Sequence, residues 1–255
     1  DRLGSIGGLK VQSDLEKFLE QSMDYCVVSS PTGTHLSMGL KLAERGIPAL
    51  IEKPLAVSEK EGVQLVNAFR SAGLIAGVGH VERFNPAILK MKSLLADGVL
   101  GELYQISTRR IGPYSGRIKD VGVARDLASH DVDLVSWLCD SSYENLDSRT
   151  LSPLGNPHED MLVAIGALGN GIVVSHLVNW MSPTKERVTS VLGEKGMLVA
   201  DTLAVDLILH EMQPREPFLV GEPGNSVGSK RKIEIENNEP LYNEHLAFQI
   251  AIKTG

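Results

Sequence analysis

Helical patterns alternate with short apolar segments through the first 80 residues, and this alternation is the strongest constraint on the fold. The helical patterns span residues 11–22, 35–46 and 58–73, and the apolar segments span residues 24–32, 47–52 and 74–80. Strands that alternate with helices of this length form βαβ units, which build a parallel sheet with helices on both faces. We therefore expect an α/β fold in this part of the chain.

Each of the three apolar segments ends in polar residues. These ends are residues 29–35, 52–54 and 79–83. The carboxyl ends of parallel strands lie at one edge of a sheet, and ligands of such sheets bind there. We expect the three polar ends to line one crevice. A buried core explains the apolar segments equally well, but it does not explain why all three become polar at corresponding positions.

The first βαβ unit of a dinucleotide-binding domain is missing from this chain. Only 24 residues precede Tyr25, whereas a βαβ unit needs ~30 or more, and no Gly-x-Gly-x-x-Gly sequence occurs. We expect residues 1–80 to be the C-terminal part of a Rossmann-like dinucleotide-binding domain, with the phosphate-binding loop upstream of Asp1. On this interpretation the 255 residues alone bind a dinucleotide poorly.

The pattern changes after Asn85. Helical patterns at residues 85–101 and 124–140 flank a strand at residues 101–112, and a series of strands follows from Ser148 onward. Gly-Asn-Gly and Glu-Lys-Gly turns between these later strands predict hairpins.

Residues 81–255 are therefore expected to form an α+β domain with a largely antiparallel open sheet, which binds substrate and mediates dimerisation. An open sheet has a face and edges to cover. For this reason we expect a homo-oligomer, a dimer or tetramer, that assembles through the sheet.

The formal net charge of -7 and the pI of about 5.5 argue against nucleic acid or an anionic membrane as a partner, because both require a concentrated basic face. The two cysteines, Cys26 and Cys139, lie in apolar segments and favour a reducing compartment over a disulfide framework. No apolar stretch approaches the roughly 20 residues of a membrane span. These features predict a cytoplasmic protein.

Asp126 and His130 are four residues apart in a helical pattern and so share one face. A carboxylate beside an imidazole orients the ring and stabilises its charged form, as a proton acceptor near neutral pH requires. Such a pair is also common on solvated helix surfaces. Asp131 and Asp133 lie on other faces and are interpreted as caps or solvated charges. His158, Glu159 and Asp160 are adjacent but lack a metal-ligand spacing, so we expect no metal site.

Four motifs together resemble the glucose–fructose oxidoreductase/inositol dehydrogenase/rhizopine-catabolism (Gfo/Idh/MocA) family of nicotinamide-dependent sugar and polyol dehydrogenases. They are residues 29–35, 52–54, 79–87 and 126–133. The resemblance extends over nearly the whole chain, and the motifs occur in the family's order and spacing. Residues 83–87, 109–123 and 179–187 are most similar to the branch of UDP-N-acetylglucosamine 3-dehydrogenase-like enzymes that act on nucleotide sugars.

The resemblance implies that Lys53 and His130 are catalytic and that Asp126 is the acidic partner of the histidine. His130 is expected to take the hydroxyl proton and Lys53 to donate to the alcohol oxygen, although the two roles can be exchanged. NAD or NADP is the expected cofactor. The implied cofactor-binding residues are Ser30, Pro31, Thr32, His35, Glu52, Lys53 and His80. His80 can equally be a structural histidine.

Candidate substrate-binding residues lie at the third strand end and in two basic segments. They are Arg83, Asn85, Arg109, Arg117, Asn179, Trp180 and Lys185, and the same basic segments contain Arg110, Lys119 and Arg187. Guanidinium groups recognise phosphate oxygens through paired hydrogen bonds, so a diphosphate-linked sugar suits these segments. For each residue alone, a solvated loop charge is an equally good explanation.

We expect an oxidoreductase that transfers a hydride between NAD or NADP and a secondary alcohol of a sugar or nucleotide sugar. A dehydrogenase of inositols or free aldoses is the first alternative, because it would not need the basic segments. The second is a catalytically silent ligand sensor, since a fold does not fix a function. The joint presence of Lys53, Asp126 and His130 argues against a sensor.

Overall fold

A computed structural model describes residues 10–114, 116, 121–212, 228–236 and 238–255. The chain divides into two compact units. The first comprises Asp1–Gly79 together with His245–Gly255, and the second comprises His80–Glu244. In the described residues, no helix is long and apolar enough to cross a lipid bilayer.

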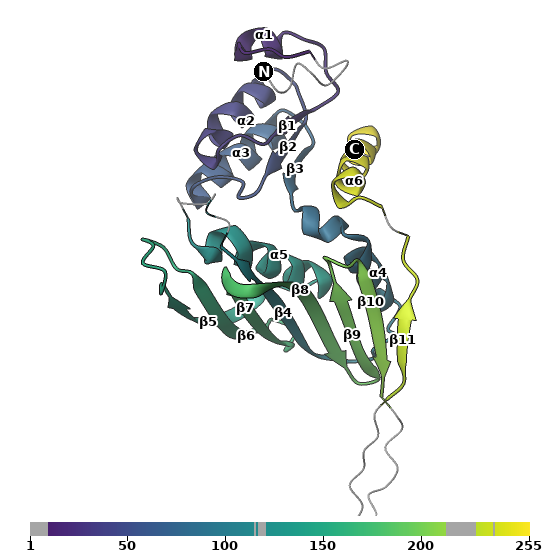
Figure 1. The fold of residues 1–255 in the computed structure, drawn as a ribbon. Coiled ribbons are helices and arrows are strands. Elements are labelled where there is room, and N and C mark those ends of the chain that lie inside the picture. Colours follow the sequence, from purple (N-terminus) through teal and green to yellow (C-terminus); the bar gives the residue numbers. More distant parts are fainter. Residues whose placement is uncertain (1–9, 115, 117–120, 213–227, 237) are drawn as a thin grey trace, which may run out of the picture. The chain divides into compact units, whose positions relative to one another are not determined.

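The first unit contains a three-stranded parallel sheet in the order β1-β2-β3 (Figure 1). Its elements are α1 (Leu15–Leu19), β1 (Cys26–Val28), η1 (Thr32–Thr34), α2 (His35–Glu44), β2 (Ala49–Glu52), α3 (Glu59–Ser71) and β3 (Ala76–Gly79). The α3 helix begins where Ser58 accepts a hydrogen bond from the backbone N–H of Glu61, as Ser at an N-cap does. Buried Leu65 and Phe69 of α3 pack in one core cluster with Ile51 of β2. The α/β organisation expected from the alternating pattern is confirmed.

The last helix, α6 (Pro240–Thr254), contributes its C-terminal part to the first unit. The ring of Phe248 contacts Tyr25 edge-on, with centroids 5.3 Å apart. Gly77 of β3 lies against the same phenylalanine, because a Cβ there would be 3.1 Å from its ring. Residues 245–255 were expected in the second domain, and these aromatic contacts are the reason they group with the first.

The second unit is built on an eight-stranded sheet in the order β11-β10-β9-β8-β4-β7-β6-β5. Its strands are β4 (Leu103–Pro113), β5 (Tyr143–Leu151), β6 (Met161–Leu168), β7 (Val173–Asn179), β8 (Met181–Gly193), β9 (Gly196–Asp201), β10 (Asp206–Glu211) and β11 (Lys230–Ile233). All neighbours pair antiparallel except β4 and β7, which pair in parallel. The sheet is thus mixed and mostly antiparallel, as expected.

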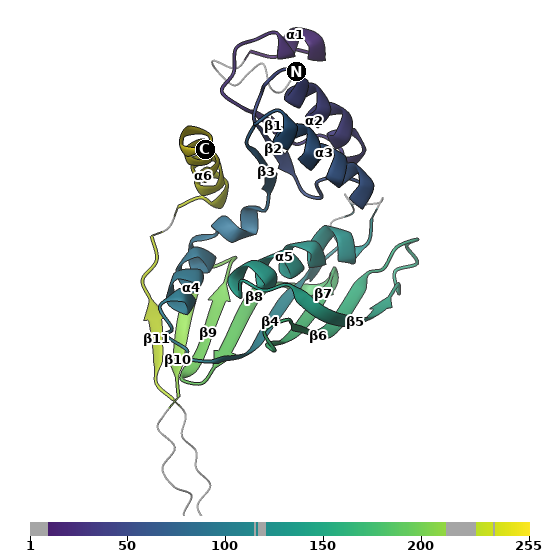
Figure 2. The ribbon, with the colours of Figure 1, turned by 180° about the vertical axis from the view of Figure 1, so that it is seen from behind.

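Helices cover one face of this sheet (Figures 1 and 2). They are α4 (Pro86–Ala96) and α5 (Ser129–Leu138), with the short turns η2 (Val81–Phe84) and η3 (Ala124–Ala128) before them. Fully buried Met91 and Leu134 pack against Ile106, Val174 and Leu198 in one cluster. Side chains alternate between the two faces along a strand. The strand residues next to Ile106, Val174 and Leu198 therefore point to the face that the helices do not cover.

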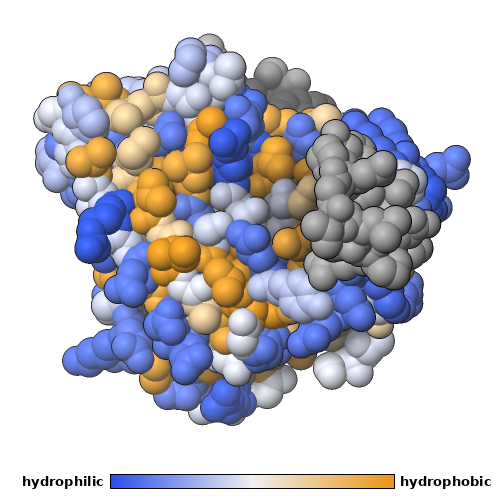
Figure 3. Space-filling view, turned by 90° about the horizontal axis from the view of Figure 1, so that it is seen from below, coloured by the Kyte–Doolittle hydropathy of each residue, from blue (hydrophilic) through white to orange (hydrophobic). Residues whose placement is uncertain are grey.

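The other face of the sheet exposes apolar side chains near one edge, on the strand beside the edge strand β5. Ile165 is 60% exposed and Val163 is 46% exposed, and both lie on β6. Across the strands, Val163 pairs with Leu177 and Ile165 pairs with Ser175. Figure 3 shows apolar side chains gathered on the lower side of the molecule with hydrophilic ones around them. Patches of this kind mark interaction surfaces when they are contiguous.

A buried histidine links three strands on the helix-covered face. The ring nitrogens of His176 lie 2.7 Å from the Thr108 hydroxyl and 2.8 Å from the Tyr143 hydroxyl. A neutral imidazole donates from one nitrogen and accepts at the other, and hydroxyls can match both roles. Burial lowers the pKa of His176 to about 4.

His176 is expected to make the second unit sensitive to acid. Its folded pKa lies below the unfolded value of 6.5, so its contribution is complete above pH 6.5 and is lost as the pH falls towards 4. The loss amounts to about 3 kcal/mol. Urea unfolding between pH 7.5 and 4 should show this extra loss in the unsubstituted protein and not in His176→Gln, with His158→Gln as control. Equal pH slopes in all three proteins would contradict the prediction.

Candidate functional site

The ends of β1, β2 and β3 lie at one edge of the parallel sheet in the first unit. Glu52, the last residue of β2, pairs with Gly79, the last residue of β3. A Cβ on Gly79 would lie 3.0 Å from Oε2 of Glu52. The Glu52 carboxylate therefore lies over the glycine, at the edge where a parallel sheet binds its ligands.

His35 connects the turns after β1 and β2. It is 1% exposed, and its ring nitrogens lie 2.8 Å from the Ser30 carbonyl oxygen and 3.1 Å from the Pro54 carbonyl oxygen. The Lys53–Pro54 peptide bond is cis. Both ring nitrogens of His35, expected to contact a cofactor, thus face backbone carbonyl oxygens, and the ring lies between the Ser30 turn and the turn that carries Lys53.

The remaining residues of the first turn present polar groups. The Ser30 hydroxyl lies 2.6 Å from the Thr34 hydroxyl, and the backbone N–H of Thr34 donates to the Pro31 carbonyl. Thr32 begins the short η1 helix and Pro31 is its exposed N-terminal neighbour. Hydroxyls in this turn and the carboxylate of Glu52 are donors and acceptors of the kind that bind ribose and phosphate groups. The residues present in the first unit fit one end of a dinucleotide.

In the second unit, three residues expected near ligands have internal partners. Arg83 donates from Nε to Oδ2 of Asp133 at 2.8 Å and from Nη2 to Oδ1, and Nδ1 of His80 lies 3.2 Å from Oδ2. Asn85 is 5% exposed; its Oδ1 caps α4 at Ala87, and its amide donates to the Thr202 carbonyl. The interpretation of Asp133 as a cap or solvated charge is wrong, because it binds Arg83.

Asp126 and His130 lie on either side of a change in helix type. Residues Ala124–Ala128 form a π-helical turn and α5 begins at Ser129. Asp126 thus lies within the π-turn and His130 in the first turn of α5. The turn is fixed by Glu159, whose backbone oxygen accepts from Val123 and whose carboxylate accepts from the Ala124 N–H at 3.0 Å. Turns of this type occur frequently at functional sites.

A buried ion cluster lies next to His130. Arg110 donates from Nε to Oδ1 of Asp131 at 2.7 Å and from Nη1 to Oε1 of Glu82 at 2.8 Å. Arg110 is 4% exposed and Asp131 is 2% exposed. The sequence interpretation of Asp131 as a cap or solvated charge is therefore wrong. Arg110, placed in a substrate-binding segment, is instead occupied by two carboxylates.

The pKa values of the two carboxylates in this cluster are shifted in opposite directions. Burial raises the pKa of Asp131, against the opposing effect of Arg110, and its Oδ2 atom has no hydrogen-bond partner among the described residues. Burial would also raise the pKa of Glu82, but the charge and hydrogen bond of Arg110 outweigh it, with help from His130 and Arg187, and the pKa is lowered. The pKa of Glu82 is thus lowered and that of Asp131 is raised, although Arg110 contacts both carboxylates.

A cavity of about 320 Å³ lies in the second unit beside this cluster. It is lined by Arg110, Ile111, Gly112, Pro113, Tyr114, Asp126, Leu127, Asn179, Trp180, Lys185 and Arg187. The structure thus brings together Asp126, Asn179, Trp180 and Lys185 from the expected set. A cavity of this size accommodates a small ligand.

Arg109 is an expected arginine that does not line this cavity. Arg109 is adjacent to Arg110 on β4, so its side chain points to the opposite face of the sheet. There it donates to Glu186 at 3.0 Å, with 53% of its side chain exposed. Arg117, like Lys119, lies outside the described residues.

Trp180 and Asn179 shape the cavity wall. Trp180 is 6% exposed, and its indole N–H donates to Oδ1 of Asp160 at 2.7 Å. Burial would raise the pKa of Asp160, but hydrogen bonds from Trp180, Asn156 and Leu154 outweigh it and lower the pKa. Asn179 accepts from the backbone N–H groups of Met181 and Ser182. Sequence analysis did not identify Asp160 as the anchor of Trp180.

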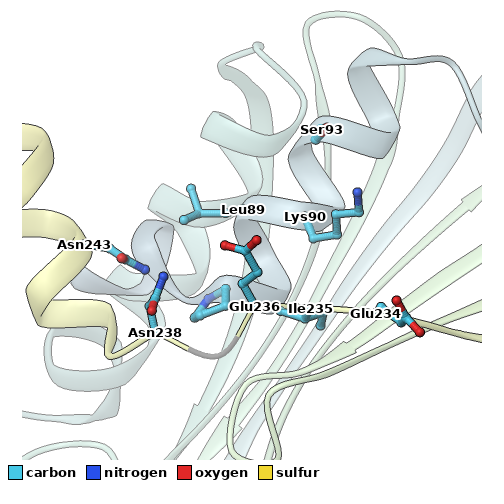
Figure 4. Close-up of a pocket in the computed structure, with 9 residues that line it drawn as sticks. Leu89, Lys90, Ser93, Glu234, Ile235, Glu236, Asn238 and Asn243 are labelled. Carbon is cyan, nitrogen blue, oxygen red and sulfur yellow. The ribbon is translucent and has the colours of Figure 1, made fainter.

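A larger hollow of about 630 Å³ lies elsewhere in the second unit. Figure 4 shows that its walls come from α4, the segment after β11 and the start of α6, with Lys90, Glu234 and Glu236 among them. None of the residues expected from the sequence lines it. Within the described ranges, no group of three or more His, Cys, Asp or Glu side chains is placed to hold a metal ion.

Two family models match this chain. Residues 6–80 match the oxidoreductase family with an NAD-binding Rossmann fold, and residues 88–199 match the GFO/IDH/MocA C-terminal domain. The chain belongs to the Gfo/Idh/MocA family of oxidoreductases.

Curated relatives include sugar and inositol dehydrogenases. The chain is 29% identical over 154 residues to UDP-N-acetylglucosamine 3-dehydrogenase of Acidithiobacillus ferrooxidans, covering 60% of this chain and 47% of that protein. It is 33% identical over 138 residues to scyllo-inositol 2-dehydrogenase (NAD(+)) of Bacillus subtilis, covering 52% and 40%. The chain thus spans about half the length of the curated relatives it matches.

Solved structures share the fold. The UDP-N-acetylglucosamine 3-dehydrogenase structure from Acidithiobacillus ferrooxidans superposes with a TM-score of 0.84 at 22% identity, over 96% of this chain and 74% of that one. Levoglucosan dehydrogenase, in complex with NADH and levoglucosan, has a TM-score of 0.74 at 16% identity, over 87% and 64%. The expected family and fold are confirmed.

Proposed function

We propose that the protein of which this chain is part oxidises or reduces a secondary alcohol of a sugar, with NAD or NADP as the hydride carrier. The observation that supports this most is the edge of the parallel sheet in the first unit, where Glu52 and the Ser30 turn lie beside the Lys53 turn. Family membership and the sugar and inositol substrates in the names of its relatives agree with it.

The proposed roles follow from the chemistry of alcohol oxidation. The bound nicotinamide supplies the hydride acceptor. His130 takes the proton of the hydroxyl, and Asp126 is its acidic partner. Lys53 donates a hydrogen bond to the oxygen and stabilises its developing negative charge. The proposed cofactor-binding residues are Ser30, Pro31, Thr32, Glu52 and His80. His35 is proposed to position the turn after β1 that contains Ser30.

A nucleotide sugar is the proposed substrate within this class. The support is the likeness to UDP-N-acetylglucosamine 3-dehydrogenase in sequence together with Asn179, Trp180 and Lys185 in one cavity. Arg83, Asn85 and Arg109 have internal partners, so the support from these residues is weaker than the sequence implied.

Full-length protein incubated with NAD or NADP and separate sugars tests the proposal. UDP-N-acetylglucosamine should give the largest rise in nicotinamide absorbance, with smaller rates for myo-inositol and glucose. Turnover of myo-inositol or glucose alone would replace the nucleotide-sugar assignment by the inositol or aldose one. Binding of sugars without any absorbance change would indicate a ligand sensor and would remove the enzyme assignment.

We also propose that two copies of the protein associate through the open face of the eight-stranded sheet. Its exposed apolar residues Ile165 and Val163 on β6 form a surface that a second copy would cover. Ile165→Asp would place a carboxylate in that interface twice, once from each copy, since a twofold interface is self-complementary.

The Ile165→Asp substitution is expected to raise the dimer dissociation constant about 100-fold, because it would bury an unpaired carboxylate in each copy. Sedimentation velocity over a concentration series measures it. Val63→Asp, at an exposed site on α3, should leave the sedimentation unchanged. If Ile165→Asp sediments like the unsubstituted protein, the sheet face is not the interface.

A further inference from the structure

Arg187 is a second arginine beside the buried ion cluster. It pairs directly with Arg110 across β8 and β4, so both side chains lie on the helix-covered face of the sheet. Like charges at directly opposed positions destabilise a sheet. Glu82 and Asp131 bind Arg110, but they make no hydrogen bond to Arg187.

The guanidinium of Arg187 has unused hydrogen-bonding capacity. Its Nη1 atom is buried and has no hydrogen-bond partner among the described residues. Burial, and then the charge of Arg110, lower the pKa of Arg187, while the charges of Glu82, Asp131 and Asp126 oppose the shift. A buried charged donor without a hydrogen-bond partner is costly to a folded protein. The nearby carboxylates offset part of this cost, but Nη1 still lacks an acceptor among the described residues, which a ligand could supply.

The cavity beside Arg187 has a positive wall. Three of its lining residues are cations, Arg110, Lys185 and Arg187, and one is a carboxylate, Asp126. Lys185 lies two residues before Arg187 on β8, so the two side chains leave the strand on the same face. Glu82 and Asp131 do not line this cavity, and an anion inside it would face mostly positive charge.

We infer that this cavity receives a negatively charged oxygen group of the substrate, carried on the sugar itself, and that Arg187 is the residue that binds it. The group is a carboxylate or a phosphate ester, since both offer oxygens to a guanidinium. Arg187 and Asp126 line the same cavity and their charges interact. Because Asp126 is the proposed partner of the catalytic histidine, an anion in this cavity would lie close to the reacting sugar, whether or not that sugar also carries a nucleotide. This assignment rests on the proposed sugar dehydrogenase function.

Binding measured by isothermal titration calorimetry on the full-length protein tests the assignment. The probes are glucuronate, glucose 6-phosphate, glucose and UDP-N-acetylglucosamine, which separate a ring carboxylate, a ring phosphate, a neutral ring and a distant diphosphate. Arg187→Met should weaken glucuronate or glucose 6-phosphate about 10- to 100-fold and leave glucose unchanged. Arg231→Met, at an exposed arginine on β11, should change none of them.

The pattern across the probes decides the source of the charge. If Arg187→Met weakens the binding of glucuronate alone, the bound group is a carboxylate. If it weakens the binding of glucose 6-phosphate alone, the bound group is a phosphate. An Arg187-dependent loss for UDP-N-acetylglucosamine alone would overturn placement on the sugar ring. Equal losses for charged and neutral probes, or no binding of either sugar anion, would overturn the anion site.

A purely structural role for Arg187 predicts a different result. Met at this position removes the attraction of Arg187 for Glu82, Asp131 and Asp126 together with the unpaired Nη1, so the decisive measurement is the stabilisation that the anion adds, not the melting temperature without ligand. Stabilisation by the bound anion should disappear at the same time. A lowered melting temperature with unchanged anion affinity would overturn the inference. Should Arg187→Met not fold, Arg187→Lys tests the same point, since it keeps the charge but loses the paired donors.

Failure of the proposed function can be distinguished from failure of the anion site. Nicotinamide absorbance is followed in the same proteins with the same sugars. Arg187-dependent anion binding without turnover of any sugar would remove the dehydrogenase proposal and keep the anion site. Turnover with anion affinities that do not depend on Arg187 would keep the enzyme and remove the site.

Discussion

Replacing Lys53 by Met, or His130 by Asn, in the full-length protein is expected to lower kcat by about 100- to 10,000-fold, the range that removal of a positioned acid or base produces. The lysine substitution removes the donor to the alcohol oxygen, and the histidine substitution removes the proton acceptor. Steady-state rates with saturating sugar and cofactor measure the effect.

The same proteins should bind the dinucleotide with little change, because neither proposed role is to hold it. Calorimetric titration with NAD separates a loss of chemistry from a loss of binding. Lys60→Met on α3 and His158→Asn in the loop before β6 are matched controls that keep normal rates. Near-normal turnover in both Lys53→Met and His130→Asn would remove the catalytic assignment.

Replacing Arg110 by Met is expected to lower the free energy of unfolding of the second unit by about 3–5 kcal/mol, since removal of one partner leaves buried charges uncompensated. Arg110 holds both Glu82 and Asp131, and all three side chains are largely or fully buried. Urea denaturation followed by Trp fluorescence measures the change, because Trp137 and Trp180 both lie in this unit.

Arg109 is a matched control for this experiment. It is the preceding residue on the same strand, but its partner Glu186 lies on the open face and its side chain is 53% exposed. Arg109→Met should therefore cost about 1 kcal/mol or less. Combining Arg110→Met with Glu82→Gln and Asp131→Asn should recover part of the loss, because the two carboxylates that Arg110 compensated are then neutral. A loss below about 1 kcal/mol in Arg110→Met alone would contradict a cluster essential for stability.

Local sequence signals predicted the regular elements of the first unit well. The cap at Ser58 and the alternation of strands and helices follow from patterns within a few residues, and the three parallel strands appear where expected. The shortest elements were less well predicted. Helix α1 covers only Leu15–Leu19, and it begins after Asp14, which accepts from the Glu16 and Lys17 N–H groups.

The π-turn and strand β5 lacked a local signal. Residues 124–140 have one continuous helical pattern, and only the distant Glu159 fixes the wider turn at Ala124–Ala128. Strand β5 is an edge strand whose residues are almost all exposed, so it has no apolar alternation to predict it.

The sequence around Arg109 and Arg110 was sufficient to predict that these two side chains lie on opposite faces of the sheet. Adjacent residues of a strand point to opposite faces, so the two arginines could not belong to one patch once residues 101–112 were assigned as a strand. The partners of Arg110 were beyond sequence reasoning, because Asp131 and Glu82 approach it only through the packing of α5 and η2 against β4.

Strand β4 joins two groups of strands that are each built from neighbours in the chain. Residues 143–179 form the β5-β6-β7 meander and residues 181–211 form β8, β9 and β10, while Ile106 of β4 pairs with Val174 on one side and Val191 on the other. Pairings between positions so far apart form slowly, because loop closure opposes them. The two meanders can take shape early, whereas the wall that holds Arg110 against Arg187 is completed only when β4 is inserted between them.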